Sequence, residues 1–308
     1  MHTSIATRVK AGSFFDLGRQ DPALTRLRED GAERALPFAL MEHLVKSGTP
    51  YGDYARALRS APVHVAGAAF DWYAAELPAQ IAEEINLTDY ELVEHTEEHR
   101  AALTRALERL ATVHPDGFAR VREFVRGLLW VRLKPGVRIS SLTSSSDPAL
   151  PYVIVFSEKA QHHIPPNTVS TEPSPLFLAE NLLHEGVHQS ISFHVLSTQV
   201  FADGYSSKTS PKIEIAWRAA QGVTRNQFWE VDRAFHATCV YNQLLRFRRT
   251  ELDRDDLTVN ERACFQAAYD EGMPAVRYLM DQLELLGEQF TRHGRELLAG
   301  LRRQTDEL

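Results

Sequence analysis

The sequence predicts a mainly α fold of the α+β class, in which helices surround one small antiparallel sheet. Long segments near both ends of the chain carry apolar residues at helical spacing. A middle segment, 127–156, is instead rich in β-branched and aromatic residues, as strands are. Hydrophobic residues make up 44% and charged residues 24% of the 308 residues, which is ordinary for a globular protein with a sizeable core.

Residues 1–126 are predicted to form an N-terminal helical region. Within it we expect one helix over 33–46, another over 71–82, and a long amphipathic helix over 88–112, because apolar residues recur on one side of each. No repeat or low-complexity tract interrupts the chain. We therefore expect this region and residues 127–308, which carry the candidate site, to form one continuous globular unit.

The remaining elements follow from composition and from turn residues. Three segments are predicted as strands of the sheet, namely 128–133, 137–142 and 152–156. Pro135 and Gly136 form a tight-turn signal between the first two. Helices are expected again over 226–249, 257–271 and 273–303. Gly272 and Pro274 are expected to separate the last two, because proline interrupts helical hydrogen bonding.

A His-Glu-x-x-His motif at 184–188 is the most specific pattern in the chain. Good helix formers precede it, which favours a helix. Residues four apart on a helix differ by about 40° in azimuth and about 6 Å in rise. His184 and His188 therefore project from one face and can bind one metal ion. Glu185 points near the open side of that ion, where a carboxylate can move a proton or orient a metal-bound water.

On a surface helix the same motif would be two solvated histidines. The apolar flanks, which include Leu182, Leu183 and Val187, indicate that this helix is buried. Buried His and Glu side chains need polar partners, and a metal ion supplies one. We therefore expect a metal centre on this helix, with the small sheet beside it.

Charge and composition exclude several classes of partner. The net charge of −7 gives no electrostatic reason to bind nucleic acid or an anionic membrane. No run approaches the roughly 18 apolar residues of a membrane span, and the first residues form no apolar signal core. Cys239 and Cys264 are the only cysteines and form no Cys-x-x-Cys pair. We expect a cytoplasmic protein that acts on a peptide or a small molecule. A homodimer is compatible with the sequence.

Two histidine ligands leave the reaction open. A metzincin protease would need a glycine at the position of Ile191 to bring His194 to the metal. If the helix continues, His194 lies about 120° and about 9 Å away from His188, out of reach. A gluzincin protease would take a downstream glutamate, for which Glu214 and Glu230 are available.

His236 is a better candidate for the third ligand. It lies on the helix expected over 226–249, in a largely apolar neighbourhood. Asp232 is one turn earlier and could orient its imidazole. A satisfied core histidine is the alternative interpretation of His236. Neutral histidine ligands with open positions suit iron(II) as well as zinc.

Several blocks in order resemble the HExxH-type 2-oxoglutarate-dependent peptide β-hydroxylases, a bacterial family of HExxH motif-containing peptide modification proteins. These blocks are a Ser-rich loop at 140–147, Pro-Tyr-Val-Ile-Val-Phe-Ser at 151–157, Leu-Ala-Glu-Asn-Leu-Leu-His-Glu-Gly-Val-His at 178–188, Ala-Trp-Arg at 216–218, and the segment 232–241. Two departures stand out. Gly186 and Val187 follow His-Glu where the family often has a bulky residue and Gln or Glu, and Ala216 replaces its proline.

The resemblance implies that His184, His188 and His236 bind iron(II), that 2-oxoglutarate is the cosubstrate, and that an unactivated carbon is hydroxylated. The departures leave a free amino acid or another small molecule open as the substrate. The distal carboxylate of 2-oxoglutarate needs a fixed cation, for which Arg218 beside Trp217 is the candidate, with Arg138 and Arg225 in reserve. A zinc metallopeptidase with Glu185 as general base is the alternative enzyme. A third hypothesis is a non-catalytic protein in which the metal only joins two helices.

Overall fold

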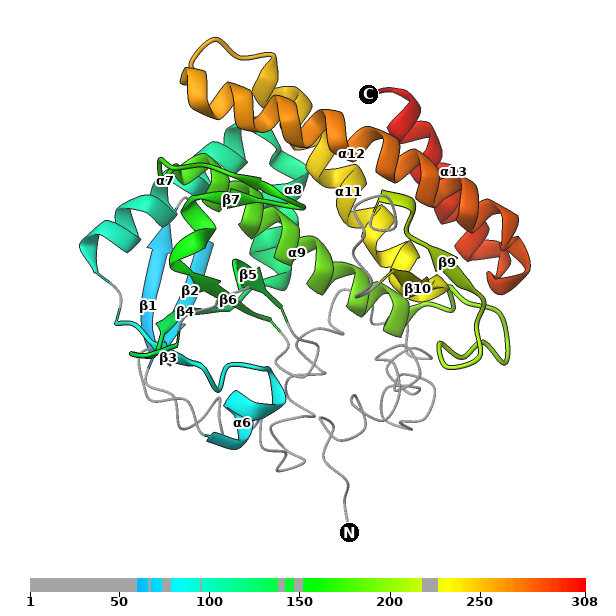
Figure 1. Ribbon diagram of the computed structural model, residues 1–308, viewed down its shortest axis with the longest axis horizontal. Coiled ribbons are helices and arrows are strands. Elements are labelled where there is room, and N and C mark those ends of the chain that lie inside the picture. Colours follow the sequence, from blue (N-terminus) through cyan, green and yellow to red (C-terminus); the bar gives the residue numbers. More distant parts are fainter. Residues whose placement is uncertain are drawn as a thin grey trace.

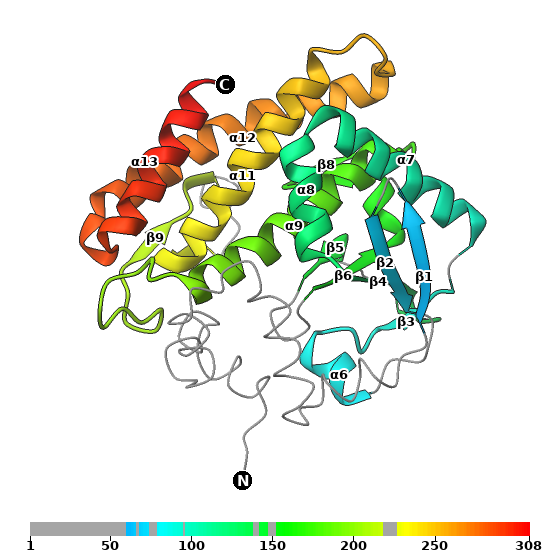
Figure 2. The same cartoon turned by 180° about the vertical axis from the view of Figure 1, so that it is seen from behind.

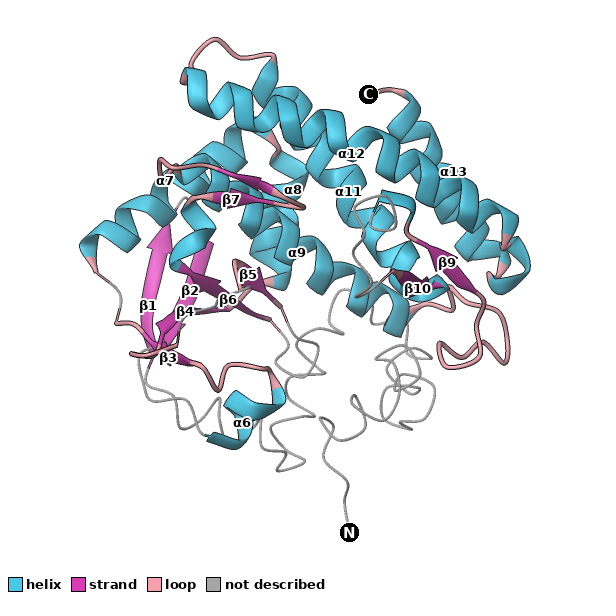
Figure 3. Ribbon diagram, in the orientation of Figure 1, coloured by secondary structure: helices cyan, strands magenta, loops and turns pink. Residues whose placement is uncertain are grey.

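Helices predominate over strands in the described part of the chain, which confirms the mainly α, α+β fold class (Figure 3). The computed structural model describes residues 60–65, 68–73, 79–94, 96–137, 142–146, 152–217 and 227–308. The helix predicted over 33–46 lies outside these residues. No helix in the described ranges is long and apolar enough to cross a membrane.

The main sheet combines strands from both sides of residue 126 (Figure 1). Its order is β1 (Ser60–Val65), β2 (Ala68–Tyr73), β4 (Gly127–Leu133), β6 (Val153–Ser157) and β5 (Ser144–Ser145), and β3 (Tyr90–Leu92) also pairs with β4. One apolar cluster likewise holds residues from before and after residue 126. The division at that residue stays a prediction, but sheet and core both cross it.

The prediction of an antiparallel sheet is wrong for its centre. β2 pairs with β4 in parallel, and β4 pairs with β6 in parallel. The chain passes from β2 to β4 through helices, and a parallel neighbour requires such a crossover. The connection 134–152 is also long enough to return the chain to the same end of the sheet. Pairings of β1, β3 and β5 with their neighbours are antiparallel.

The helix predicted over 71–82 is also wrong in its first part, which belongs to β2. Trp72 is fully buried on this strand and stacks on Trp130 of β4 with ring centroids 5.7 Å apart. Burying two indoles against each other across a sheet outweighs a weak local helix preference. A helix follows only later, as α6 (Ala79–Glu84).

Six longer helices lie in the described part of the chain. They are α7 (Glu97–Val113), α8 (Pro115–Phe124), α9 (Pro175–Ser197), α11 (Val231–Leu252), α12 (Val259–Leu285) and α13 (Arg292–Asp306). The short 3-10 helix η1 (Glu158–Gln161) follows β6, and η2 (Gly287–Gln289) joins α12 to α13. Two hairpins complete the described elements, namely β7 (His163–Ile164) with β8 (Thr168–Val169) and β9 (Lys212–Glu214) with β10 (Phe228–Glu230). In both views α9 runs from the sheet toward α11, α12 and α13 (Figures 1 and 2).

The break predicted at Gly272 and Pro274 is wrong, because α12 continues through both residues. Proline removes one helical hydrogen bond, but side chains are buried on both sides of it, such as Phe265 before it and Val276 after it. Gly272 allows α12 to pack closely against α11, because a Cβ at this position would lie 3.0 Å from Leu245 Cδ2.

A buried ion pair ties α9 to α11 one turn before the motif. The side chains of Glu180 and Arg248 are fully buried, and Arg248 Nε donates to both carboxylate oxygens at 3.2 and 3.1 Å. The guanidinium also donates to the carbonyl oxygens of Ala268 and Pro165. These bonds satisfy the charges and fix the relative position of the two helices.

Arg248→Met should therefore destabilise the protein strongly, because Glu180 would be left buried without a cation. We expect a loss of about 3–5 kcal/mol in the free energy of unfolding, measured by urea denaturation. Arg292→Met removes an exposed pair with Glu296 and should cost less than about 1 kcal/mol. Equal losses in the two variants would contradict a structural role for the buried pair.

Candidate metal centre

The predicted helix forms, and it carries the His-Glu-x-x-His motif in its middle. Ser174 caps α9 by accepting a hydrogen bond from the Leu176 N–H, and Pro175 occupies its first turn. Its flanking side chains, including Leu182, Leu183 and Val187, are fully buried. Such a helix can hold polar residues in its middle only where they find partners.

His184 and His188 converge as the spacing predicts. Their Nε2 atoms lie 3.0 Å apart, and their ring centroids lie 4.7 Å apart. Together with Glu185 they place one ligand atom each within 4.8 Å of one another, a group that could hold a metal ion. His184 Nδ1 is buried and has no hydrogen-bond partner among the described residues. One shared N–H···N bond therefore does not satisfy the pair.

The structure brings His236 of α11 to the same place. Its ring centroid lies 4.7 Å from that of His188, and its Nε2 is 3.1 Å from the His188 carbonyl oxygen. In this conformation His236 lies outside the compact group of His184, Glu185 and His188. It would have to turn its ring toward the pair to share an ion. Asp232 is buried one turn earlier, and its Oδ1 accepts a hydrogen bond from the Arg233 N–H.

Burial keeps the three imidazoles neutral. Loss of solvation lowers the pKa of His184 and of His236 to about 3, and the pKa of His188 to about 4. Repulsion between neighbouring rings, when they are protonated, lowers these pKa values further. Neutral imidazole is the form that binds a metal ion. The donor set therefore fits a metal without first having to lose protons at neutral pH.

Two serine hydroxyls hold the Glu185 carboxylate. Ser144 Oγ donates to Glu185 Oε1 and Ser146 Oγ donates to Oε2, each at 2.6 Å. Ser144 makes this contact from the edge strand β5. Asn181, one turn before Glu185, accepts from the same Ser144 hydroxyl and donates to the carbonyl oxygens of Ala160 and His163. The carboxylate of Glu185 is thereby fixed 3.9 Å from His184 Nε2.

Sequence reasoning did not predict this role for Ser144 and Ser146. The Ser-rich loop at 140–147 was the available signal, but nothing in its composition indicates which hydroxyl faces which carboxylate.

Gly186 has a structural reason in this chain. A Cβ at this position would lie 2.8 Å from Val121 Cγ2 and 3.5 Å from Val121 Cα. A bulky side chain at this position would force α8 away from α9. The close approach of the two helices therefore accounts for glycine between the two histidines.

The alternative third ligands lie elsewhere. α9 continues through Ile191 to Ser197, as expected, and His194 Nε2 lies 3.3 Å from His293 Nε2 of α13. Glu230 pairs with Lys212 at 3.3 Å, and exposed Glu214 accepts from Gln227. In the described part of the chain, neither glutamate belongs to the group around His184 and His188.

Arg218, the candidate for binding 2-oxoglutarate, lies outside the described residues, as do Arg138 and Arg225. The neighbouring Trp217 is half-buried, and its ring meets those of Trp229 and Tyr278 edge to face at 6.1 and 6.0 Å. No protein-family model matches the sequence, and no curated protein matches it. The geometry and chemistry of the site are therefore what bear on function.

Proposed function

We propose that the protein is a non-haem iron(II)/2-oxoglutarate-dependent oxygenase that hydroxylates an unactivated carbon of a peptide or amino-acid-like substrate. The observation that carries the proposal is the close, half-buried pair His184 and His188 with His236 beside it on a second helix. When bound with 2-oxoglutarate, iron(II) would supply oxygen activation and the oxidant for a C–H bond. The residues of this chain would hold and orient the reactants.

The 3.0 Å between His184 Nε2 and His188 Nε2 is short enough for both nitrogens to bind one ion. His184 and His188 would hold the metal from α9, and His236 would hold it from α11. Neutral imidazole ligands suit iron(II) as well as zinc, so the donor set supports a metal centre and the reaction assay decides between the two metals.

The surroundings of Glu185 suit a positioning role in the proposed oxygenase. Both carboxylate oxygens accept short hydrogen bonds from Ser144 and Ser146, which hold the side chain rigidly. Each oxygen keeps a second lone pair, so Glu185 can also accept a hydrogen bond from a bound water or from the substrate. A general base would make the same contact with water, so the Glu185→Gln experiment separates the two roles. The cysteines, Cys239 and Cys264, are free and buried, which suits the reducing cytoplasm in which we place the protein.

Cosubstrate binding tests the assignment of Arg218. Under anaerobic conditions, 2-oxoglutarate should bind the iron(II)-loaded protein much more tightly than the metal-free protein, measured by calorimetric titration. Arg218→Lys should leave iron binding unchanged and weaken 2-oxoglutarate binding by roughly 10- to 100-fold, because lysine cannot form the bidentate pair. Arg122→Lys, an exposed change on α8, is the matched control. Equal affinity in the presence and absence of iron would contradict the proposal.

A further inference from the structure

A second pair of histidines lies farther along the motif helix. His194 of α9 and His293 of α13 place their Nε2 atoms 3.3 Å apart, with ring centroids 5.5 Å apart. His194 follows His188 by six residues, which is about 9 Å along a helix, so the His194–His293 pair is separate from the metal centre. Two nitrogens at this spacing either share one N–H···N hydrogen bond or bind one ion between them. Both residues are half-buried, so an ion and water molecules can reach them.

The backbone around the His194–His293 pair holds the two rings in place. The Thr291 N–H donates to the Val200 carbonyl oxygen at 3.0 Å, and the Thr291 hydroxyl donates to the Gln199 carbonyl oxygen at 2.6 Å. Gly294, next to His293, packs so closely on the segment after α9 that a Cβ would overlap the Val200 carbonyl oxygen. The start of α13 is therefore fixed against the end of α9. A site whose backbone is already positioned loses little freedom when an ion binds.

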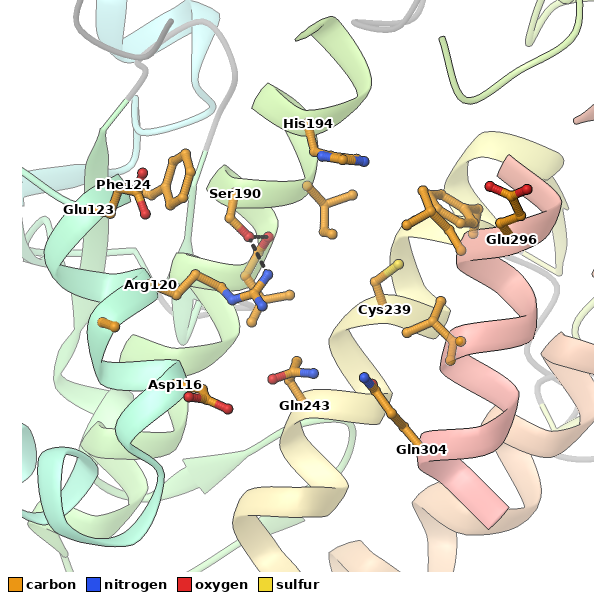
Figure 4. Close-up of a pocket in the computed structure, with 17 residues that line it drawn as sticks. Asp116, Arg120, Glu123, Phe124, Ser190, His194, Cys239, Gln243, Glu296 and Gln304 are labelled. Carbon is orange, nitrogen blue, oxygen red and sulfur yellow. Dashed lines mark hydrogen bonds between the residues drawn. The ribbon is translucent and has the colours of Figure 1, made fainter. Parts of the chain in front are cut away.

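The electrostatic surroundings of His194 favour a cation. His194 lines a cavity of about 590 Å³ between α8, α9, α11 and α13 (Figure 4). The charged side chains in the lining of this cavity are those of Asp116, Glu123 and Glu296 against that of Arg120 alone. Three carboxylates and one guanidinium leave an excess of negative charge, and such a wall concentrates cations near it.

Glu296 is the carboxylate best placed to join the two imidazoles. It follows His293 by three residues on α13, so both side chains leave the same side of the helix. Its carboxylate accepts a hydrogen bond from Arg292 Nε at 2.8 Å, but both side chains are exposed, and such pairs are weak. In this conformation Glu296 forms no compact group with the two histidines, so its side chain would turn from Arg292 to the ion.

We propose that His194 and His293, joined by Glu296, form a second metal site that binds a zinc-like divalent ion and ties α13 to α9. Imidazole and carboxylate ligands suit zinc, and at such a site zinc binds more tightly than iron(II). Stoichiometric iron(II) therefore stays at the three-histidine centre, and His194→Ala should not change iron occupancy there. The second site does not depend on the reaction proposed for that centre.

Calorimetric titration of the full chain with zinc tests the second site. A His184→Ala/His188→Ala double variant lacks two ligands of the first centre and should still bind one equivalent of zinc. Adding His194→Ala or His293→Ala to it should weaken zinc binding by at least roughly 100-fold, because one imidazole of the chelating pair is lost. His64→Ala, an exposed change on β1, is the matched control and should keep the zinc bound. Calcium, which prefers oxygen ligands, should not bind.

The stoichiometry of the wild type keeps the test decisive even if the double variant does not fold. The wild type should bind two equivalents of zinc, and its His194→Ala and His293→Ala variants should each bind one. Zinc in excess should raise the melting temperature of His188→Ala but not that of His188→Ala/His293→Ala, because the second ion binds only the folded chain. Glu296→Gln should weaken binding of the second equivalent roughly tenfold, and unchanged affinity would contradict the part of Glu296 in the site. A single equivalent in the wild type, or a second equivalent that survives loss of either histidine, would overturn the proposal.

Discussion

His184→Ala and His188→Ala should each abolish stoichiometric metal binding. Each change removes one of the two nitrogens that lie 3.0 Å apart on α9, and the remaining ring would share the ion with His236 alone. Loss of an outer hydrogen-bond partner typically lowers metal affinity by about 10- to 100-fold, so loss of a ligand should exceed about 100-fold. Equilibrium dialysis against iron(II) under anaerobic conditions, with metal analysis of the protein, measures this directly.

His236→Ala tests whether the second helix completes the donor set. We expect a loss comparable to that of His188→Ala. His194→Ala is the matched control, because His194 lies on the same helix as the pair but contacts His293 instead. Full metal occupancy in His236→Ala would show that His236 is not the third ligand.

Glu185→Gln should separate the two leading chemistries. In a zinc peptidase the carboxylate takes the proton of the attacking water, so turnover should fall by on the order of 10²–10⁴ while the metal stays bound. In the proposed oxygenase no general base is needed to remove a hydrogen atom. Glu185→Gln should then keep iron and measurable 2-oxoglutarate decarboxylation, with hydroxylation weakened or uncoupled from it.

The serine contacts make this substitution a mild one. Ser144 and Ser146 can each donate to or accept from a glutamine amide, so the side chain should keep its position. Glu158→Gln, an exposed change on η1, is the control. Succinate is measured at matched iron occupancy in wild type and both variants. Its loss in Glu185→Gln alone would show that Glu185 is essential before oxygen activation, which contradicts the positioning role.

Local patterns predicted much of the fold. The motif helix formed as expected because apolar residues surround its polar core, and β4 and β6 followed their β-branched composition. The pairing of strands could not be predicted in the same way, since neighbours in the sheet are chosen by contacts distant in sequence, such as Trp72 on Trp130. The helix break predicted at Pro274 is wrong for the same reason, because tertiary packing keeps α12 continuous through this residue.

In the candidate site too, local features could be predicted from the sequence and contacts between distant segments could not. The i, i+4 spacing of His184 and His188 is a local property, so their convergence could be predicted. His236 was selected by its apolar neighbourhood, and the structure places its ring beside that of His188. The contacts of Ser144 and Ser146 with Glu185 join separate elements, so only the fold reveals them.

Release of succinate tests the central proposal most directly. The protein is reconstituted anaerobically with iron(II) or with zinc, then given 2-oxoglutarate and air, and succinate is quantified alongside cleavage of an unstructured protein substrate. We predict succinate from the iron form, none from the zinc form or from iron-treated His188→Ala, and no peptide cleavage by either form. Peptide cleavage by the zinc form, without succinate from the iron form, would contradict the oxygenase and favour the peptidase.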